Sequence, residues 1–286
     1  MEPKEFSVDR GSFELRGWSA GADGAPAVLC LHETAASAAV WEPLAAALGE
    51  RVRVVAFDRR GWGGSGAPED YRRTTIEEQA GDAEAVAESI GSAPVMVCGA
   101  GIGGVVALEL ALRRAELVAA AILIEPPLLG LVAEATPMIS ADAEAIRRET
   151  AAVGARLGEG SDAREAAALG AGAALDLYLS GELAAIGAGA DRIPDAIADR
   201  ERASPFALFA EVAAISGWTI PLAELPRLGP PATVVLARST PPFSRRAAEA
   251  LAVRLPGADL RELAATGLPQ LDGVDELAAI VLEISR

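Results

Sequence analysis

A cluster of glycines is the part of this sequence whose residue types and spacing point most directly to chemistry. Gly99, Gly101 and Gly104 follow the apolar run Val95–Cys98 with the spacing G-x-G-x-x-G, and an apolar segment with helical periodicity comes next. A strand, a tight turn and a helix in this order let the backbone approach a pyrophosphate at the positive end of the helix. Glu125 stands at about the distance, roughly 20 residues, at which such sites place a carboxylate on a ribose hydroxyl. One interpretation of the turn is therefore dinucleotide binding.

A second set of residues could carry out acid–base chemistry. His32, the only histidine of the chain, follows the apolar run Ala27–Leu31, and Glu33 and Thr34 come directly after it. Glu125 closes another apolar run. Two carboxyl groups in one cavity, one of them with a raised pKa, can act as general acid and general base. This hypothesis requires that neither Glu33 nor Glu125 points into bulk solvent.

The composition limits the classes of function. The chain has 286 residues, 51% of them hydrophobic, so it can bury a full core as one large domain. Its 41 acidic and 25 basic residues give a formal net charge of −16, which repels nucleic acid and anionic lipid. No signal-peptide pattern and no run of about 18 apolar residues is visible, so we expect a cytoplasmic protein. Cys30 and Cys98 each end an apolar run and are expected to be buried thiols.

The first 125 residues alternate between strand-like and helix-like patterns. The expected strands are Phe6–Val8, Ser12–Trp18, Ala27–Leu31, Val52–Phe57, Val95–Cys98 and Val118–Ile124, the first two forming an antiparallel hairpin. The expected helices are Val40–Leu48, Thr74–Ile90 with a capping box of Thr74 and Glu77, and a segment that ends near Arg114. This alternation predicts an α/β fold with a mostly parallel sheet and helices on both faces.

The alternation stops at Glu125-Pro126-Pro127 and resumes near residue 232. Between them, alanine-rich helices are expected at Ser140–Leu157 and Ser161–Tyr178, with Ser140 and Ser161 as N-caps. The later strands and helices are expected at Thr233–Ala237, Phe243–Leu255, Ala258–Leu263 and Val274–Ile284. We therefore predict a core made of residues 1–125 and 221–286, with a helical insertion at 126–220.

Four blocks of the sequence, in the same order, resemble those of the α/β-hydrolase family. They are His32-x-x-x-x-Ser37-x-x-x-Trp41, Asp58-Arg59-Arg60-Gly61-Trp62-Gly63-Gly64-Ser65, Glu125-Pro126-Pro127 and Leu268-Pro269-Gln270-Leu271-Asp272. The glycine turn is similar to that family's nucleophile elbow, G-x-S-x-G. The resemblance covers nearly the whole chain and implies an α/β-hydrolase fold in which the insertion is a helical cap. It weighs against a flavin-type dinucleotide motif, because such a motif normally opens its domain and three expected strands precede it here.

The chain departs from this family at the three positions where the resemblance implies a catalytic triad. The nucleophile would stand at residue 101 and the histidine base at residue 267, but these are Gly101 and Gly267. The acid usually follows the strand at 233–237, and Arg238-Ser239-Thr240-Pro241 contains no carboxylate. Hydrolysis in this family needs a nucleophile, a histidine base and an acid that orients the base. We therefore predict that serine-hydrolase chemistry has been lost.

Three side chains near the expected nucleophile each have two interpretations under the resemblance. His32 belongs to the oxyanion turn, where its ring braces the backbone, and catalysis is the alternative. Glu33 replaces a glycine: pointing inward, it would oppose a developing negative charge and could hold a ligand's hydroxyl or amine. Pointing outward, it would be a solvated loop residue. Glu125 is either a structural carboxylate paired with a basic residue or a relocated triad acid.

Three functions remain open at this point. We favour a protein that binds a small, mostly apolar molecule between core and cap. Its expected pocket residues are His32, Glu33, Thr34, Gly101, Ile102, Glu125 and Trp218. The alternative is a lyase, isomerase, cyclase or hydrolase that uses Glu33 and Glu125 as acid and base, and a third possibility is a scaffold that binds a partner protein. We expect no cofactor, no metal, and neither nucleic acid nor a membrane as partner.

Overall fold

The chain folds around one eight-stranded sheet in the computed structural model, which describes residues 3–69, 71–91, 94–132, 135–157, 163–183, 189–195, 197–198, 206–219 and 221–286. The strand order is β1-β2-β4-β3-β5-β6-β7-β8. The strands are β1 (Lys4–Asp9), β2 (Glu14–Ala20), β3 (Ala27–Leu31), β4 (Arg53–Phe57), β5 (Val95–Ala100), β6 (Val118–Ile124), β7 (Ala232–Ala237) and β8 (Asp259–Leu263). The pairs β1–β2 and β2–β4 are antiparallel and the others are parallel, which confirms the predicted mostly parallel sheet.

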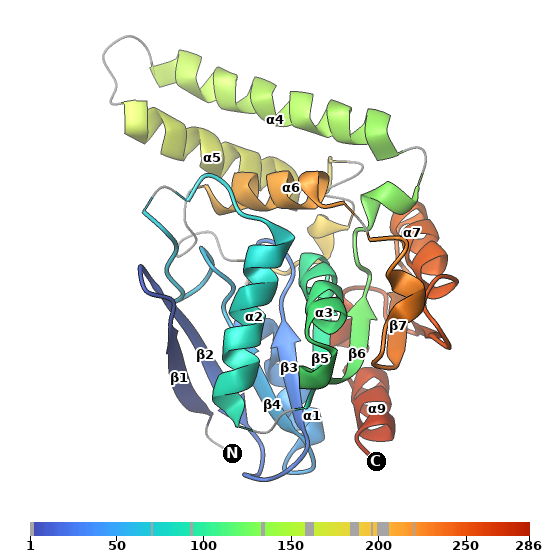
Figure 1. Ribbon diagram of the computed structural model, residues 1–286. Helices are drawn as coiled ribbons and strands as arrows, with labels where there is room; N and C mark the ends of the chain where they lie inside the picture. Colours follow the sequence, from blue (N-terminus) through green and yellow to red (C-terminus); the bar gives the residue numbers. More distant parts are fainter. Residues whose placement is uncertain are drawn as a thin grey trace.

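Helices cover both faces of this sheet (Figure 1). The α-helices are α1 (Glu42–Leu48), α2 (Ile76–Ile90), α3 (Ile102–Arg113), α4 (Ala135–Leu157), α5 (Ala163–Leu179), α6 (Ala207–Gly217), α7 (Pro242–Ala252), α8 (Pro269–Asp272) and α9 (Val274–Ile284). Short 3₁₀ helices are η1 (Ala38–Trp41), η2 (Ala115–Leu117), η3 (Leu129–Leu131), η4 (Ala190–Arg192) and η5 (Leu225–Arg227). Helices α2, α3 and α7 pack on one face, and α1 and α9 pack on the other.

The central strands read as continuous apolar runs because both of their faces are covered. Every residue of β3, β5 and β7 is buried. Cys30 in β3 and Cys98 in β5 lie side by side in the parallel register, and both are buried free thiols. Within the described residues, no helix has the length and apolarity that a bilayer crossing requires.

Four elements form a separate layer beyond the carboxyl ends of the parallel strands: α4, α5, η4 and α6, which we call the helical layer (Figure 1). Helices α4 and α5 pack against each other, and α5 also contacts η4 and α6. The N-cap predicted at Ser140 is wrong, because Ser140 lies inside α4 and its hydroxyl donates to the carbonyl oxygen of Thr136 at 3.0 Å. Ser161, the other predicted N-cap, lies outside the described residues.

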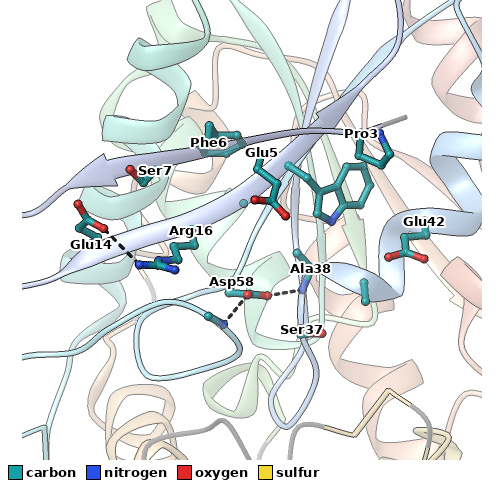
Figure 2. Close-up of a pocket in the computed structure, with 14 residues that line it drawn as sticks. Pro3, Glu5, Phe6, Ser7, Glu14, Arg16, Ser37, Ala38, Glu42 and Asp58 are labelled. Atoms are coloured by element: carbon teal, nitrogen blue, oxygen red, sulfur yellow. Dashed lines mark hydrogen bonds and ion pairs between the residues drawn. The ribbon is translucent and has the colours of Figure 1, made fainter. Parts of the chain in front are cut away.

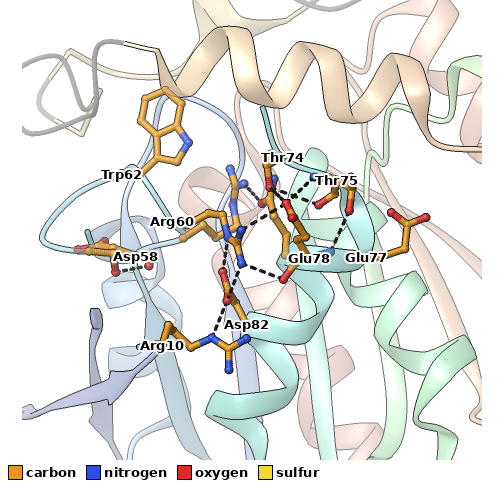
Figure 3. Close-up of polar contacts among 12 residues, drawn as sticks. Arg10, Asp58, Arg60, Trp62, Thr74, Thr75, Glu77, Glu78 and Asp82 are labelled. Carbon is orange, nitrogen blue, oxygen red and sulfur yellow. Dashed lines mark hydrogen bonds and ion pairs between the residues drawn. The ribbon is translucent and has the colours of Figure 1, made fainter. Parts of the chain in front are cut away.

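The capping box of α2 lies one residue later than the sequence pattern predicts. Thr75, not Thr74, is the N-cap: its hydroxyl accepts from the N–H of Glu78 at 3.1 Å, and the Glu78 carboxylate accepts from the N–H of Thr75 at 3.1 Å (Figure 3). Both threonines are followed by a glutamate at the third position, so the pattern fits either register. Arg60 lies beside the observed box, with its guanidinium on Glu78 and on the buried Asp82.

Candidate functional site

The turn between β5 and α3 has the geometry of a strand-to-helix elbow. Gly101 stands alone between the two elements with φ 54° and ψ −126°, a conformation that strains any residue with a side chain. Its N–H donates to the carbonyl oxygen of Ile124 at the end of β6, at 2.9 Å. A β-carbon on Gly103 would overlap the carbonyl oxygen of Leu31, so glycine lets α3 approach β3 closely. The elbow that the resemblance implied is therefore present. Position 101 lies at the carboxyl ends of the parallel strands, where the helical layer covers them.

Glu33 occupies the space above this elbow. A β-carbon built on Gly101 would stand 2.9 Å from the β-carbon of Glu33, closer than real β-carbons approach one another. Glu33 is 7% exposed and lines a cavity together with Gly101, so its carboxylate does not reach bulk solvent. Of the two orientations that the sequence left open, the structure has the inward one.

The carboxyl group of Glu33 is held by one amide. Gln270, on the short helix α8, donates from Nε2 to the two carboxyl oxygens at 3.1 and 3.0 Å. Burial raises the pKa of Glu33 to about 7, and the nearby Glu125 adds to the increase. The backbone N–H of Glu33 and the guanidinium groups of Arg59 and Arg192 act in the opposite direction. The carboxyl group can therefore gain or lose a proton near neutral pH.

Glu125 lies at the end of β6 and is bound from several sides. The Arg192 guanidinium of η4 contacts both of its oxygens, at 2.5 and 3.3 Å. The N–H of Ala237 donates to it at 3.2 Å, and the hydroxyl of Thr240 also contacts it. Glu125 has a positive φ of 45°, an unusual conformation for a residue with a side chain, which the surrounding contacts hold in place. The structure thus matches the interpretation of Glu125 as a carboxylate paired with an arginine.

Arg192 also reaches Gly267, the position at which the resemblance implies a histidine base. Its Nη1 donates to the carbonyl oxygen of Gly267 at 3.1 Å. The N–H of Gly267 in turn donates to Asp272 at 2.7 Å, which fixes the loop before α8. A guanidinium remains protonated at all physiological pH values, so it can bind an anion but cannot accept a proton.

His32 has both ring nitrogens bound to the backbone. Nε2 accepts from the N–H of Arg59 at 2.9 Å, so Nδ1 carries the proton and donates to the carbonyl oxygen of Glu33 at 2.7 Å. The side chain is fully buried, and burial together with the charge of Arg59 holds the pKa of His32 well below its usual value. The ring is therefore neutral and braces the turn.

A cavity of about 70 Å³ lies between the elbow and the helical layer, and five of the seven predicted pocket residues line it: Glu33, Thr34, Gly101, Ile102 and Glu125. His32, predicted to line it, does not: both of its ring nitrogens bind the backbone. Trp218 does not line the cavity either, because it packs against the apolar cluster on the α2, α3 and α7 face.

Sequence reasoning missed four polar residues of the cavity wall: Tyr178, Arg192, Ser244 and Gln270. Tyr178 and Arg192 come from the insertion, where no motif or spacing distinguishes them from their neighbours. Gln270 falls within a block that the family resemblance did single out, beside the position expected for the base. Its place in this block was the one feature of the sequence that could have indicated Gln270 as a site residue.

A buried ion pair joins the helical layer to the core. Glu211 on α6 has no solvent exposure and binds the guanidinium of Arg59. It also accepts from the indole N–H of Trp62 at 2.7 Å and from the hydroxyl of Thr34 at 2.7 Å. Nothing in the sequence pattern pointed to Glu211. Because this network includes Thr34, the helical layer is fixed directly against the cavity wall.

A larger groove of about 780 Å³ lies elsewhere, between the β1–β2 hairpin and η1 (Figure 2). Its wall carries the acidic side chains of Glu5, Glu14 and Glu42. Asp58 also lines it and accepts from the N–H groups of Ala38 and Gly64, each at 2.7 Å. These bonds assign Asp58 to holding two loops together. The groove contains no part of the elbow.

The comparisons with known proteins agree with this geometry. The model of the alpha/beta hydrolase family matches residues 28–280, which is most of the chain. The protein belongs to the α/β-hydrolase family, and both the predicted family and the predicted fold class are confirmed.

The individual proteins to which the chain is similar share a third or less of their aligned residues with it. The chain is 32% identical to epoxide hydrolase A of Mycobacterium tuberculosis over 128 residues, which are 44% of this chain and 40% of that protein. It is similar over 99% of its length to an esterase from Thermogutta terrifontis, covering 97% of that structure with a TM-score of 0.69 and 18% identity. An enol-lactonase from Burkholderia xenovorans matches over 98% of this chain and 99% of its own, with a TM-score of 0.64 and 20% identity. At such identities the two structures show the fold alone.

Proposed function

We propose that this member of the α/β-hydrolase family binds a small, mostly apolar molecule in the cavity at Gly101 and does not cleave esters by the serine route. The observation that carries the proposal is the 2.9 Å distance between the Glu33 β-carbon and the place of a β-carbon at position 101. Gly101 supplies no nucleophile, and Glu33 fills the space that a nucleophile would need. In well-studied triads the loss of members costs about 10⁴–10⁶ in rate.

The surroundings of Gly267 support the same proposal. A β-carbon at this position would stand 3.5 Å from the Asp272 carboxylate, and Arg192 donates to the Gly267 carbonyl oxygen. Arg192 cannot take a proton from a nucleophile or from water. In addition, an ionised Glu33 would repel the negative charge that develops on a carbonyl oxygen during acyl transfer. In this proposal, residues 126–220 act as a cap that closes the binding cavity.

The wall of the cavity suits a ligand with an apolar body and a polar end. Apolar side chains from the core and the helical layer contribute Ile102, Ile124, Ile193, Ile215 and Leu268. Polar side chains also line it, in part as two pairs: Glu33 with Gln270, and Glu125 with Arg192. Ligand pockets in proteins generally fix orientation through a few polar groups and gain affinity from apolar contact.

Three measurements on the purified protein test this proposal. Turnover of p-nitrophenyl acetate, butyrate and octanoate should not exceed a buffer blank, and a fluorophosphonate should leave the intact mass unchanged. A titration with small amphiphiles should raise the melting temperature, because a ligand that binds only the folded state stabilises it. A stoichiometric phosphonate adduct or turnover well above the blank would overturn the proposal.

A second candidate is an enzyme that uses Glu33 and Glu125 as acid and base. It is favoured by one observation: both carboxyl groups line the same cavity, and burial holds the pKa of Glu33 at about 7. A general acid or base works best with a pKa near the operating pH. This candidate predicts turnover of a carbonyl or hydroxyl substrate that Glu33→Gln abolishes. The contact of Arg192 with both oxygens of Glu125 leaves that carboxylate less able to take part.

A further inference from the structure

We propose that the cavity recognises a small primary ammonium ion, held between the carboxylate of Glu33 and the side-chain oxygen of Gln270. This inference rests on the proposed binding function and names the chemical class of its ligand. It depends on an unpartnered buried acceptor, on the balance of charge around Glu33 and on the size of the cavity.

The unpartnered acceptor is Oε1 of Gln270. The side chain is 1% exposed, and its Nε2 donates to both oxygens of Glu33. The opposite orientation of the amide would place Oε1 against an ionised carboxylate, so the ionised form of Glu33 sets this orientation. Within the described residues Oε1 has no hydrogen-bond partner, although buried acceptors nearly always have one. Gln270 lines the cavity but this oxygen has no accessible surface, so a donor group on a ligand there reaches it when the amide turns toward the cavity.

The arginines near Glu33 are each paired with another carboxylate and not with Glu33. Arg192 contacts both oxygens of Glu125, and Arg59 is bound to Glu211. Glu33 itself contacts a neutral amide, and among the described residues no cation lies within ion-pair distance of it. A buried carboxylate without a cation is costly, and a ligand that brings a positive charge removes that cost.

The remaining groups that face Glu33 do not supply this charge. His32 is neutral, because burial and Arg59 hold its pKa well below the usual value. Burial raises the pKa of Tyr178 on α5, so its hydroxyl stays protonated. Glu211 on α6 reaches the site only through Thr34. The charge at the cavity is therefore governed by the proton on Glu33.

The size of the cavity and the number of hydrogen-bond donors on the ligand favour an ammonium over other polar groups. The cavity of about 70 Å³ holds roughly five water-sized groups, enough for a short chain of non-hydrogen atoms. An ammonium has three N–H donors, so it can bind Glu33 and Gln270 at once, whereas an alcohol has one O–H and satisfies one of them. A carboxylate ligand would face Glu33 and would have to displace Glu125 from Arg192.

The test is calorimetric titration of the full chain with three series of two to six carbons: n-alkylammonium chlorides, n-alkanols and n-alkanoates. At pH 8 we expect the best alkylammonium to bind at least about tenfold more tightly than the alkanol of equal length, since charge-assisted hydrogen bonds are about twice as strong as neutral ones. Its affinity should fall about tenfold between pH 8 and pH 6, because Glu33 gains a proton as the pH passes its pKa of about 7.

Two variants identify the residues. Glu33→Gln should remove both the preference for ammonium and the pH dependence, so that the alkylammonium and the alkanol of equal length bind within about threefold of each other. Glu50→Gln removes the same charge from an exposed position beyond α1 and should behave as the unmodified protein. Gln270→Leu should weaken the alkylammonium more than the alkanol.

The outcomes separate the two proposals. Alkanols that bind as tightly as alkylammonium ions, or an affinity that does not change with pH, would overturn the ammonium proposal and leave the binding function in place. Tighter binding of the alkanoates would do the same. If no member of the three series binds, both the ligand class and the proposed binding function are wrong.

Discussion

The β-carbon of Glu33 lies 2.9 Å from the place where a β-carbon on Gly101 would stand, so both positions cannot carry a side chain without a shift of the backbone. Glu33 is the second residue of the loop after β3, and Gly101 is the single residue between β5 and α3. Because β3 and β5 are neighbours in the parallel sheet, their carboxyl ends bring these two positions together. The identity of one residue therefore restricts the other.

A serine at position 101 should be tolerated poorly unless Glu33 is also changed. We expect Gly101→Ser to lower the free energy of unfolding by about 2–4 kcal/mol, from its positive φ and from overlap with Glu33. The double variant Gly101→Ser, Glu33→Gly should recover part of the loss. Urea denaturation measures both.

Gly49 provides a matched control for that experiment. It has nearly the same backbone conformation, φ 59° and ψ −131°, but a β-carbon there would meet nothing within 4 Å. Gly49→Ser therefore introduces the backbone strain without the overlap, and it should lower the free energy of unfolding by less than Gly101→Ser does. Equal losses at positions 49 and 101 would contradict the steric coupling.

The raised pKa of Glu33 should make folding stability depend on pH. Its pKa is about 7 in the folded protein and near the ordinary value of 4.5 in the unfolded chain. Between these values the folded state binds more protons, so stability falls as the pH rises from 4.5 to 7 and then becomes level. A difference of this size corresponds to about 3 kcal/mol. Glu33→Gln should remove this decrease in the unfolding free energy, measured by urea denaturation at a series of pH values. The same decrease in the variant and in the unmodified protein would refute the prediction.

The ion pair between Arg192 and Glu125 should contribute to stability. Arg192 is 14% exposed and Glu125 8%, so Arg192→Ala leaves a nearly buried carboxylate without its cation. We expect a loss of about 3 kcal/mol, and a smaller loss when Glu125→Gln accompanies it. The pair Arg147–Glu144 on α4 is the control: its side chains are 67% and 53% exposed, so Arg147→Ala should cost less than about 1 kcal/mol. Similar losses from the two arginine variants would be inconsistent with a buried role for Arg192.

Glu211 should hold the helical layer against the core. Glu211→Gln leaves the Arg59 guanidinium buried without its carboxylate and weakens the contact with Trp62. We expect a loss of about 3–5 kcal/mol in unfolding free energy and faster limited proteolysis within α6. Glu182→Gln, at an exposed site just after α5, is the control. A protease pattern identical in both variants would exclude the anchoring role.

Much of the fold could be predicted from the sequence because it depends on local patterns. Ala27–Leu31 and Val118–Ile124 have the same bounds in the structure as in the prediction, since an apolar run between turns leaves little choice. The glycine turn could also be predicted from the sequence, because a tight approach of helix and strand requires residues without side chains. The shift of the capping box from Thr74 to Thr75 marks the limit: two equivalent local patterns overlap, and the local pattern does not choose between them.

The sequence by itself determined the family, the parallel sheet and the absence of side chains at positions 101 and 267. Only the tertiary structure decided that Glu33 points inward, because the direction of a loop side chain depends on what lies across the cavity. Its partner Gln270 is 237 residues away along the chain. In the same way, Arg192 reaches Glu125 and Gly267 only because the helical layer folds over the ends of the strands. Contacts between distant segments arise from packing, and no local periodicity encodes them.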